Sequence, residues 1–202
     1  MGTARADEPP ASPPAQPTLV SGDVTLRPWR LGDESTILPL YDTEVAGWFG
    51  LSRGTPVLPR MQEAIRRWHQ GYADARGIVS FLVVRTADPV PVGTCQVRGD
   101  DDQVGVVSWS MFAPYRRTGY ATAALIALCR YAFDELHLER LEVYLDPGSR
   151  VRQRAVVRSG FAREGLLRGK RTVDGVRQDL VLYARLASDP VPVLRLRERL
   201  RR

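Results

Sequence analysis

A short turn between a strand-like and a helix-like segment carries the residues best suited to chemistry. Positions 114–122 read Pro-Tyr-Arg-Arg-Thr-Gly-Tyr-Ala-Thr, after a strand-like run at 104–112 and before a helix-like run at 121–136. The first N–H groups of a helix have no partner inside the helix, and the helix dipole adds partial positive charge there. Gly119 permits a close backbone approach or a positive φ, and two arginines lie beside it. The turn therefore predicts an anion site that suits a pyrophosphate.

Two other nucleotide-binding motifs are excluded at this turn. Gly119 is not followed by the Lys and Ser/Thr of G-x-x-x-x-G-K-[ST], and a single glycine does not make G-x-G-x-x-G. Glycine turns before helices and solvated loop arginines are also common without any ligand, so that ordinary interpretation stays open on these residues alone.

Several further segments, in their order and spacing, resemble the GNAT superfamily of N-acetyltransferases. Arg116–Ala121 matches the R/Q-x-x-G-x-G/A loop that holds the coenzyme A pyrophosphate in that family. Segments 141–147 (Leu-Glu-Val-Tyr-Leu-Asp-Pro) and 159–165 (Ser-Gly-Phe-Ala-Arg-Glu-Gly) resemble its second motif. Segments 24–29 and 44–48 resemble the branch of ribosomal-protein N-terminal acetyltransferases. The resemblance spans residues 22–187.

The resemblance implies an α/β fold, with a splayed mixed sheet of about seven strands and helices on both faces. Hydrophobic periodicity predicts the elements. Strands are expected at 24–29, 79–86, 92–98, 103–112, 140–145, 161–172 and 176–186, and helices at 33–41, 60–76, 121–136 and 149–158. We expect a disordered Pro/Ala-rich tail over 1–20, one GNAT domain over 21–187 and a basic tail over 188–202.

The resemblance also implies a coenzyme A site in a V between strands 103–112 and 140–145. The pantetheine amides of acetyl-CoA, or of another acyl-CoA, would pair with exposed strand backbone there. The expected contacts come from the end of the first strand, the loop and the start of the last helix: Met111, Phe112, Ala113, Arg116, Arg117, Thr118, Gly119, Tyr120, Ala121, Thr122, Ser149 and Arg152. Arg116 holds the family's motif position, so we expect it to contribute more than Arg117.

Acyl transfer to an amine needs a neutral amine, a polarised thioester carbonyl and a proton for the departing thiolate. The family often supplies a base from strand 103–112, but positions 106–110 hold no carboxylate. Glu142 and Tyr144, two residues apart on one face of the next strand, are candidates, with proton loss to water as the alternative. Ser149 is the candidate that stabilises or protonates the thiolate, and a helix N-cap is its alternative role. Trp48 and Trp68 could wall the acceptor cleft or simply pack.

Composition limits the partners. The net charge of +6, with Lys170 the only lysine, fits an anionic cofactor or an acidic partner. Because no dense basic stripe with interleaved aromatics is present, nucleic acid is not predicted. Cys95 and Cys129 lie in apolar runs, which indicates buried thiols of a cytoplasmic protein. No Cys/His cluster has metal-ligand spacing and no apolar run approaches about 20 residues, so neither a metal nor a membrane partner is expected.

The favoured function is an N-acyltransferase that moves acetyl or another short acyl group from acyl-CoA to a primary amine. The acceptor would be a protein N-terminus or an amine on a small molecule or antibiotic, with direct transfer in a ternary complex. The missing family base leaves open a non-catalytic coenzyme A-binding module, and the arginine content leaves open a ribosome- or RNA-associated one. Monomer and homodimer are both compatible with the sequence.

Overall fold

The fold is described from a computed structural model of the chain. The structure describes residues 15–40, 42, 46, 49, 57–73, 77–173 and 175–192. Most of the two predicted terminal tails, and Trp48, lie outside the described residues.

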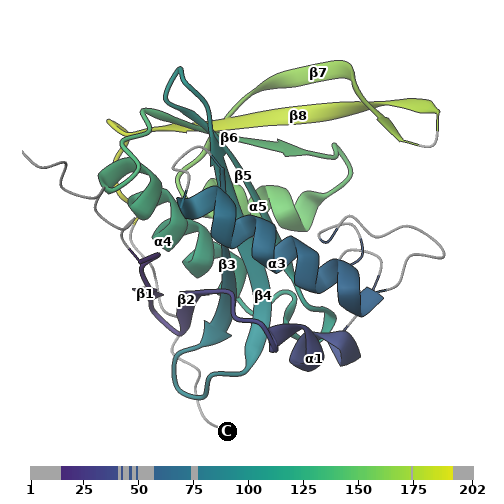
Figure 1. Cartoon of the computed structure of the whole chain (residues 1–202). Helices are drawn as coiled ribbons and strands as arrows, with labels where there is room; N and C mark the ends of the chain where they lie inside the picture. Colours follow the sequence, from purple (N-terminus) through teal and green to yellow (C-terminus); the bar gives the residue numbers. More distant parts are fainter. Residues whose placement is uncertain are drawn as a thin grey trace, which may run out of the picture.

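The described residues form one eight-stranded mixed sheet (Figure 1). In spatial order its strands are β1 (Leu19–Ser21), β2 (Val24–Pro28), β3 (Ile78–Arg85), β4 (Pro91–Gly99), β5 (Val104–Met111), β6 (Arg140–Leu145), β8 (Val176–Leu186) and β7 (Ala162–Val173). All neighbours are antiparallel except β5 and β6, which need a helical crossover because they run parallel. The predicted strands are confirmed. β1 was missed because three residues are too few to show alternation.

Helices cover both faces of the sheet, as predicted. They are α1 (Asp33–Ile37), the 3-10 turn η1 (Leu38–Leu40), α3 (Val57–Ala73), the 3-10 turn η2 (Ala113–Tyr115), α4 (Tyr120–Asp134) and α5 (Arg150–Arg158). Alternate residues of β3 show the two sides: Phe81 and Val83 pack in the cluster of α4, whereas Leu82 and Val84 pack with α3. None of the described helices is long and apolar enough to cross a membrane.

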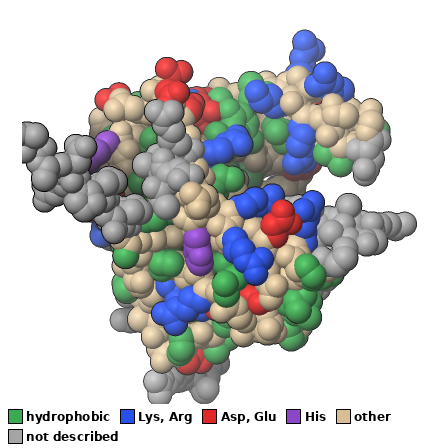
Figure 2. All heavy atoms as spheres, in the orientation of Figure 1, with side chains coloured by type: hydrophobic (Ala, Val, Ile, Leu, Met, Phe, Trp, Pro, Cys, Tyr) green, Lys and Arg blue, Asp and Glu red, His purple; other side chains and the backbone are tan. Residues whose placement is uncertain are grey.

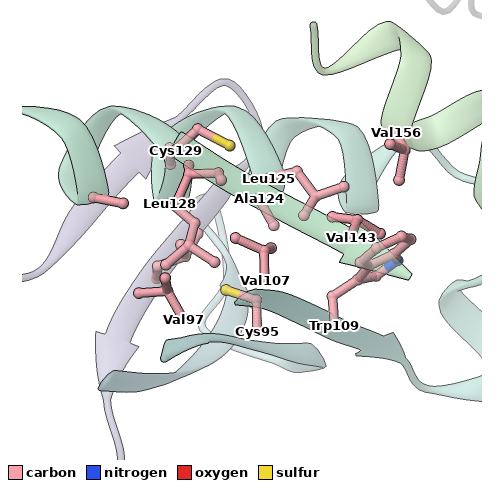
Figure 3. Packing of buried hydrophobic residues seen from close by; sticks show 14 of the residues in the cluster. Cys95, Val97, Val107, Trp109, Ala124, Leu125, Leu128, Cys129, Val143 and Val156 are labelled. Carbon is pink, nitrogen blue, oxygen red and sulfur yellow. The ribbon is translucent and has the colours of Figure 1, made fainter. Parts of the chain in front are cut away.

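The larger core lies between the sheet and α4 (Figure 3). Cys95, Val107 and Trp109 project from β4 and β5 toward Leu125 and Leu128 of α4. The helix also carries Ala123, Ala124, Ala127 and Ala132 on buried positions, and small side chains let it lie close to the strands. This packing fixes where α4 begins, and therefore where its N-terminal turn points.

Candidate functional site

The sheet opens into a V between its two parallel strands. β5 and β6 are paired only over Val104–Val106 and Arg140–Glu142, so their later residues separate. The N–H of Phe112 donates to the carbonyl of Val92 on β4, 3.0 Å away. Because backbone groups alternate in direction along a strand, Met111 and Trp109 turn theirs toward the V. Those two residues, rather than Phe112, turn backbone groups toward the V.

The turn after β5 is shaped to gather backbone donors at the start of α4. Gly119, the N-cap of α4, has φ 100°, and Arg117 has φ 66°, so two nearby residues adopt left-handed conformations. Turns of this kind form anion-binding concavities from successive N–H groups. Within the described part of the chain, no hydrogen bond engages the N–H groups of Thr118, Gly119 or Ala121. The turn therefore gathers N–H groups that have no partner among the described residues at the N-terminus of α4.

A pocket of about 230 Å³ lies between this turn and α5. Its wall is made by Met111, Tyr115, Arg117, Thr118, Gly119, Ala121, Val151, Arg154, Ala155 and Arg158. Three guanidinium groups thus border the free backbone donors. The pocket suits a polyanion attached to an extended, partly apolar chain, which is the chemistry of coenzyme A.

Sequence reasoning missed the contribution of α5 to this pocket. Val151, Arg154, Ala155 and Arg158 follow the three- and four-residue spacing of one helical face. That spacing of arginines could have been noticed on the predicted helix. Nothing in the sequence, however, showed that this face turns toward residues 115–121.

The two arginines of the turn have different surroundings. Arg116 donates from Nε to the carbonyl of Met111 (2.9 Å) and pairs with Asp42 (2.6 Å). Its side chain is not among those that line the pocket, whereas that of Arg117 is. The local reason is that Arg116 lies beside β5 and folds back along it. Arg116 therefore anchors the turn, and Arg117 faces the anion site.

Arg152 reaches into the V from the inner side of α5. Its guanidinium donates to the carbonyl of Trp109 (3.0 Å) and lies 4.7 Å from the centroid of the Trp109 ring. The contact joins α5 to the exposed edge of β5. Arg152 thus lies beside the backbone that a pantetheine amide would pair with, and not in the arginine-lined pocket.

Glu142 and Tyr144 lie together on β6, as predicted, on the face that α3 covers. The phenol of Tyr144 donates to Glu142, which also accepts from Arg140 (2.8 Å), and Arg140 in turn binds Glu164 of β7. The hydrogen bond to Glu142 and partial burial raise the pKa of Tyr144 to about 12. Hydrogen bonds from Arg140 lower the pKa of Glu164. These side chains form a continuous row of hydrogen bonds and ion pairs that starts at Glu164. The row ends at the protonated phenol of Tyr144, beside the V.

Ser149 begins α5 but makes no side-chain capping bond. Its N–H donates to the carbonyl of Asp146 (3.0 Å), which holds the turn instead. The hydroxyl of Ser149 therefore does not cap the helix. Ser149 is not one of the residues that line the pocket between the turn and α5.

Trp68 packs inside the molecule. It is only 7% exposed, and its ring lies 5.1 Å from that of Trp29 and 5.5 Å from that of Phe49. Of the two roles considered for Trp68, this environment is that of a packed side chain, because the amphipathic helix α3 turns the indole toward β3. Among the described residues, no group of three or more His, Cys, Asp or Glu side chains could hold a metal ion.

The family model for the acetyltransferase (GNAT) domain matches residues 23–162. The chain belongs to this family. The match covers β2 through α5 and therefore the turn, the V and the arginine pocket.

Relatives agree with this placement. YdaF of Bacillus subtilis (strain 168), a candidate ribosomal N-acetyltransferase, is 30% identical over 121 residues, which are 59% of this chain and 64% of YdaF. An uncharacterised N-acetyltransferase, p20 of Bacillus licheniformis, is 24% identical over 84% of this chain and 96% of its own. RimJ of Mycobacterium smegmatis, solved in complex with CoA-disulfide, superposes with a TM-score of 0.63 at 23% identity, covering 85% of this chain and 86% of RimJ. Such a superposition shows a shared fold.

The turn yields a test that separates charge from backbone strain. Asn and Asp both tolerate the left-handed conformation and have the same size, and a Cβ atom at position 119 meets nothing within 4 Å. We expect Gly119→Asp to bind acetyl-CoA at least about tenfold more weakly than Gly119→Asn, because only Asp repels a pyrophosphate. Isothermal titration calorimetry measures both affinities, and equal affinities would place the anion elsewhere.

The two arginines yield a second test. Arg117→Gly removes a positive charge from the pocket, so acetyl-CoA affinity should fall several-fold. It also removes the backbone strain of a non-glycine residue in the left-handed conformation, so thermal stability should not fall. Arg116→Gln removes the bonds to Met111 and Asp42, so the melting temperature falls and affinity falls less. Titration at low and high salt, beside thermal melts, measures both effects, with Arg130→Gln on α4 as a control. A larger affinity loss in Arg116→Gln would contradict the assignment.

Proposed function

We propose that this GNAT acetyltransferase moves acetyl, or another short acyl group, from acyl-CoA to a primary amine by direct transfer in a ternary complex. The observation that carries the proposal is the shared pocket of the donor-rich turn and the arginine face of α5, at the open end of the V. The similarity to YdaF, which is named as a candidate ribosomal N-acetyltransferase, supports a protein N-terminus as acceptor. A small-molecule amine remains the second acceptor class to test. No observation favours a non-catalytic or RNA-associated role.

In this proposal, different residues bind different parts of coenzyme A. The N–H groups of Thr118, Gly119 and Ala121, with Arg117, Arg154 and Arg158, would hold the pyrophosphate. The backbone of Trp109 and Met111 would pair with the pantetheine amides. Phe112, Ala113, Tyr120 and Thr122 would contribute by shaping the loop and the start of α4. When bound, the cofactor supplies a thioester carbonyl at the inner part of the V.

Tyr144 and Glu142 can remove a proton from the acceptor amine. As the phenol oxygen of Tyr144 accepts the amine proton, its own proton passes to Glu142, which already accepts its hydrogen bond. The proton then rests on Glu142, and Arg140 keeps that carboxylate oriented. Ser149, whose hydroxyl makes no capping bond, would donate to the departing thiolate.

Neither cysteine suits a covalent acyl intermediate. Cys95 and Cys129 are both fully buried in the core with α4. Burial raises the pKa of Cys95 far above its ordinary value and that of Cys129 to about 12, the latter despite the nearby Arg185. A thiol that stays protonated and lacks access to the V is a poor nucleophile, which supports direct transfer.

A thiol-release assay tests the proposed function. Purified protein is incubated with acetyl-CoA or succinyl-CoA and a panel of peptides and small amines, and free coenzyme A is measured. Turnover is expected only when an amine is present, and mass spectrometry should place the acyl group on that amine. Binding of acetyl-CoA without thiol release from any acceptor would contradict catalysis. A stable acyl adduct on the protein would contradict direct transfer.

The proton relay makes a separate prediction. Tyr144→Phe should lower kcat by about tenfold to a hundredfold while leaving acetyl-CoA affinity unchanged, because one acid–base group is lost. Glu142→Gln should give a similar loss, and the double variant should lose little more than either alone. Since the pKa of Tyr144 is raised to about 12, the phenol stays protonated below that pH and no step in the rate profile near neutrality should disappear with it. Additive losses would show two independent roles.

A further inference from the structure

A second charged surface lies on the opposite side of the sheet from the coenzyme A pocket. Figure 2 shows this face: Lys and Arg side chains gather over the β7–β8 hairpin and over α3, and the surface is hollowed between them. The side chains concerned are exposed: Lys170 and Arg171 on the hairpin, and Arg66 and Arg67 on α3. We name these four residues the basic face. It has no part in holding the coenzyme A pyrophosphate.

Strand register and a ring contact place the two hairpin cations on the same side of the sheet as Tyr144. Leu182 of β8 is paired with Tyr144, and Gln178, four residues earlier, projects to the same side because side chains alternate. Arg171 is paired with Gln178 and donates to its side chain (3.0 Å), so Arg171 shares that side. Independently, Nζ of Lys170 lies 5.6 Å from the centroid of the Tyr144 ring. Lys170 therefore lies beside Tyr144, and Arg171 lies further along the hairpin on the same side of the sheet.

The helix supplies the other border of the hollow. α3 packs on this same side of the sheet through Ala64, Ile65 and Trp68. Its single acidic side chain, Glu63, pairs with Arg60, whereas Arg66 and Arg67 are exposed further along. Of the carboxylates on this side of β6 and β7, Glu142 and Glu164 are both paired with Arg140. These two carboxylates and one guanidinium carry one net negative charge, which the four exposed cations of the basic face outnumber.

We infer that the basic face docks an acidic polypeptide segment whose N-terminal amine enters the V beside Tyr144. This inference rests on the proposed function and names the acceptor class. Cations on two separate elements match an extended chain with several carboxylates better than one small acid, which could reach only one border. Charge complementarity of this kind raises the association rate and selects partners.

Edge protection is the competing explanation for the hairpin charges. β7 is an edge strand of the sheet, and natural proteins place Lys and Arg on such strands to prevent pairing with other chains. That explanation requires charge on either side of the strand and makes no demand on α3. It predicts that loss of the charges changes aggregation and leaves acceptor preference unchanged.

The experiment compares three peptides of equal length and identical N-terminal residue, with Asp/Glu, Asn/Gln or Arg at the following positions. Thiol release gives kcat/KM for each peptide at low and high salt. A labelled, N-acetylated acidic peptide gives binding by fluorescence anisotropy without acyl-CoA. The variants are Lys170→Glu and Arg171→Glu, the charge-preserving Lys170→Arg, and Arg130→Glu on α4 as the matched control on the other side of the sheet. Thermal melts and acetyl-CoA affinity establish that each variant is folded.

We expect the acidic peptide to be preferred over its amide counterpart by at least about tenfold at low salt, and the preference to shrink at high salt. Each reversal to Glu should lower both kcat/KM and anisotropy binding several-fold for the acidic peptide alone, while Lys170→Arg and Arg130→Glu keep both. Equal kcat/KM for the three peptides, or an equal loss in Arg130→Glu, would overturn the inference while the proposed function stands. Turnover of free glutamate as efficient as that of the peptide would also overturn it. Charge-dependent binding without thiol release from any amine would instead sink the proposed function and leave the docking surface in place.

Discussion

The separation of β5 from β6 is the constraint on which the rest of the site depends. Only three residues of β5 are paired with three residues of β6, and the backbone beyond them faces the V. Exposed strand backbone is costly unless it finds partners, and here two arginines supply them: Arg116 binds the carbonyl of Met111 and Arg152 that of Trp109. Arg116 thereby holds the turn against β5, and Arg152 holds α5 against the V. The opening of the sheet is therefore supported by the residues that surround it.

Packing of α4 connects this opening to the anion site. The helix is buried against β4 and β5 along most of its length, so its first turn cannot move independently of the sheet. Left-handed residues at 117 and 119 then turn free N–H groups into the pocket that α5 closes with Arg154 and Arg158. The ends of β5, α4 and α5 thus position the groups that line the pocket.

The two sides of the sheet carry different sets of charged residues. The side of α4 and α5 has the arginine pocket, and the side of α3 has the row from Tyr144 to Glu164 and the basic face.

The sequence by itself determined the strands β2 to β8, the helices and the anion turn, because alternation, helical spacing and Gly119 are local signals. It also placed Glu142 and Tyr144 on one face of β6, since strand periodicity requires this. Tertiary structure decided what each side chain touches: Arg116 folds back on β5, Arg117 faces the pocket, and Trp68 is turned into the core. It also brought Arg154 and Arg158 to one side of the V and Lys170 to the other. These contacts join residues far apart in the chain, and no local pattern encodes the direction in which a helix face or a hairpin side chain points once the elements have packed.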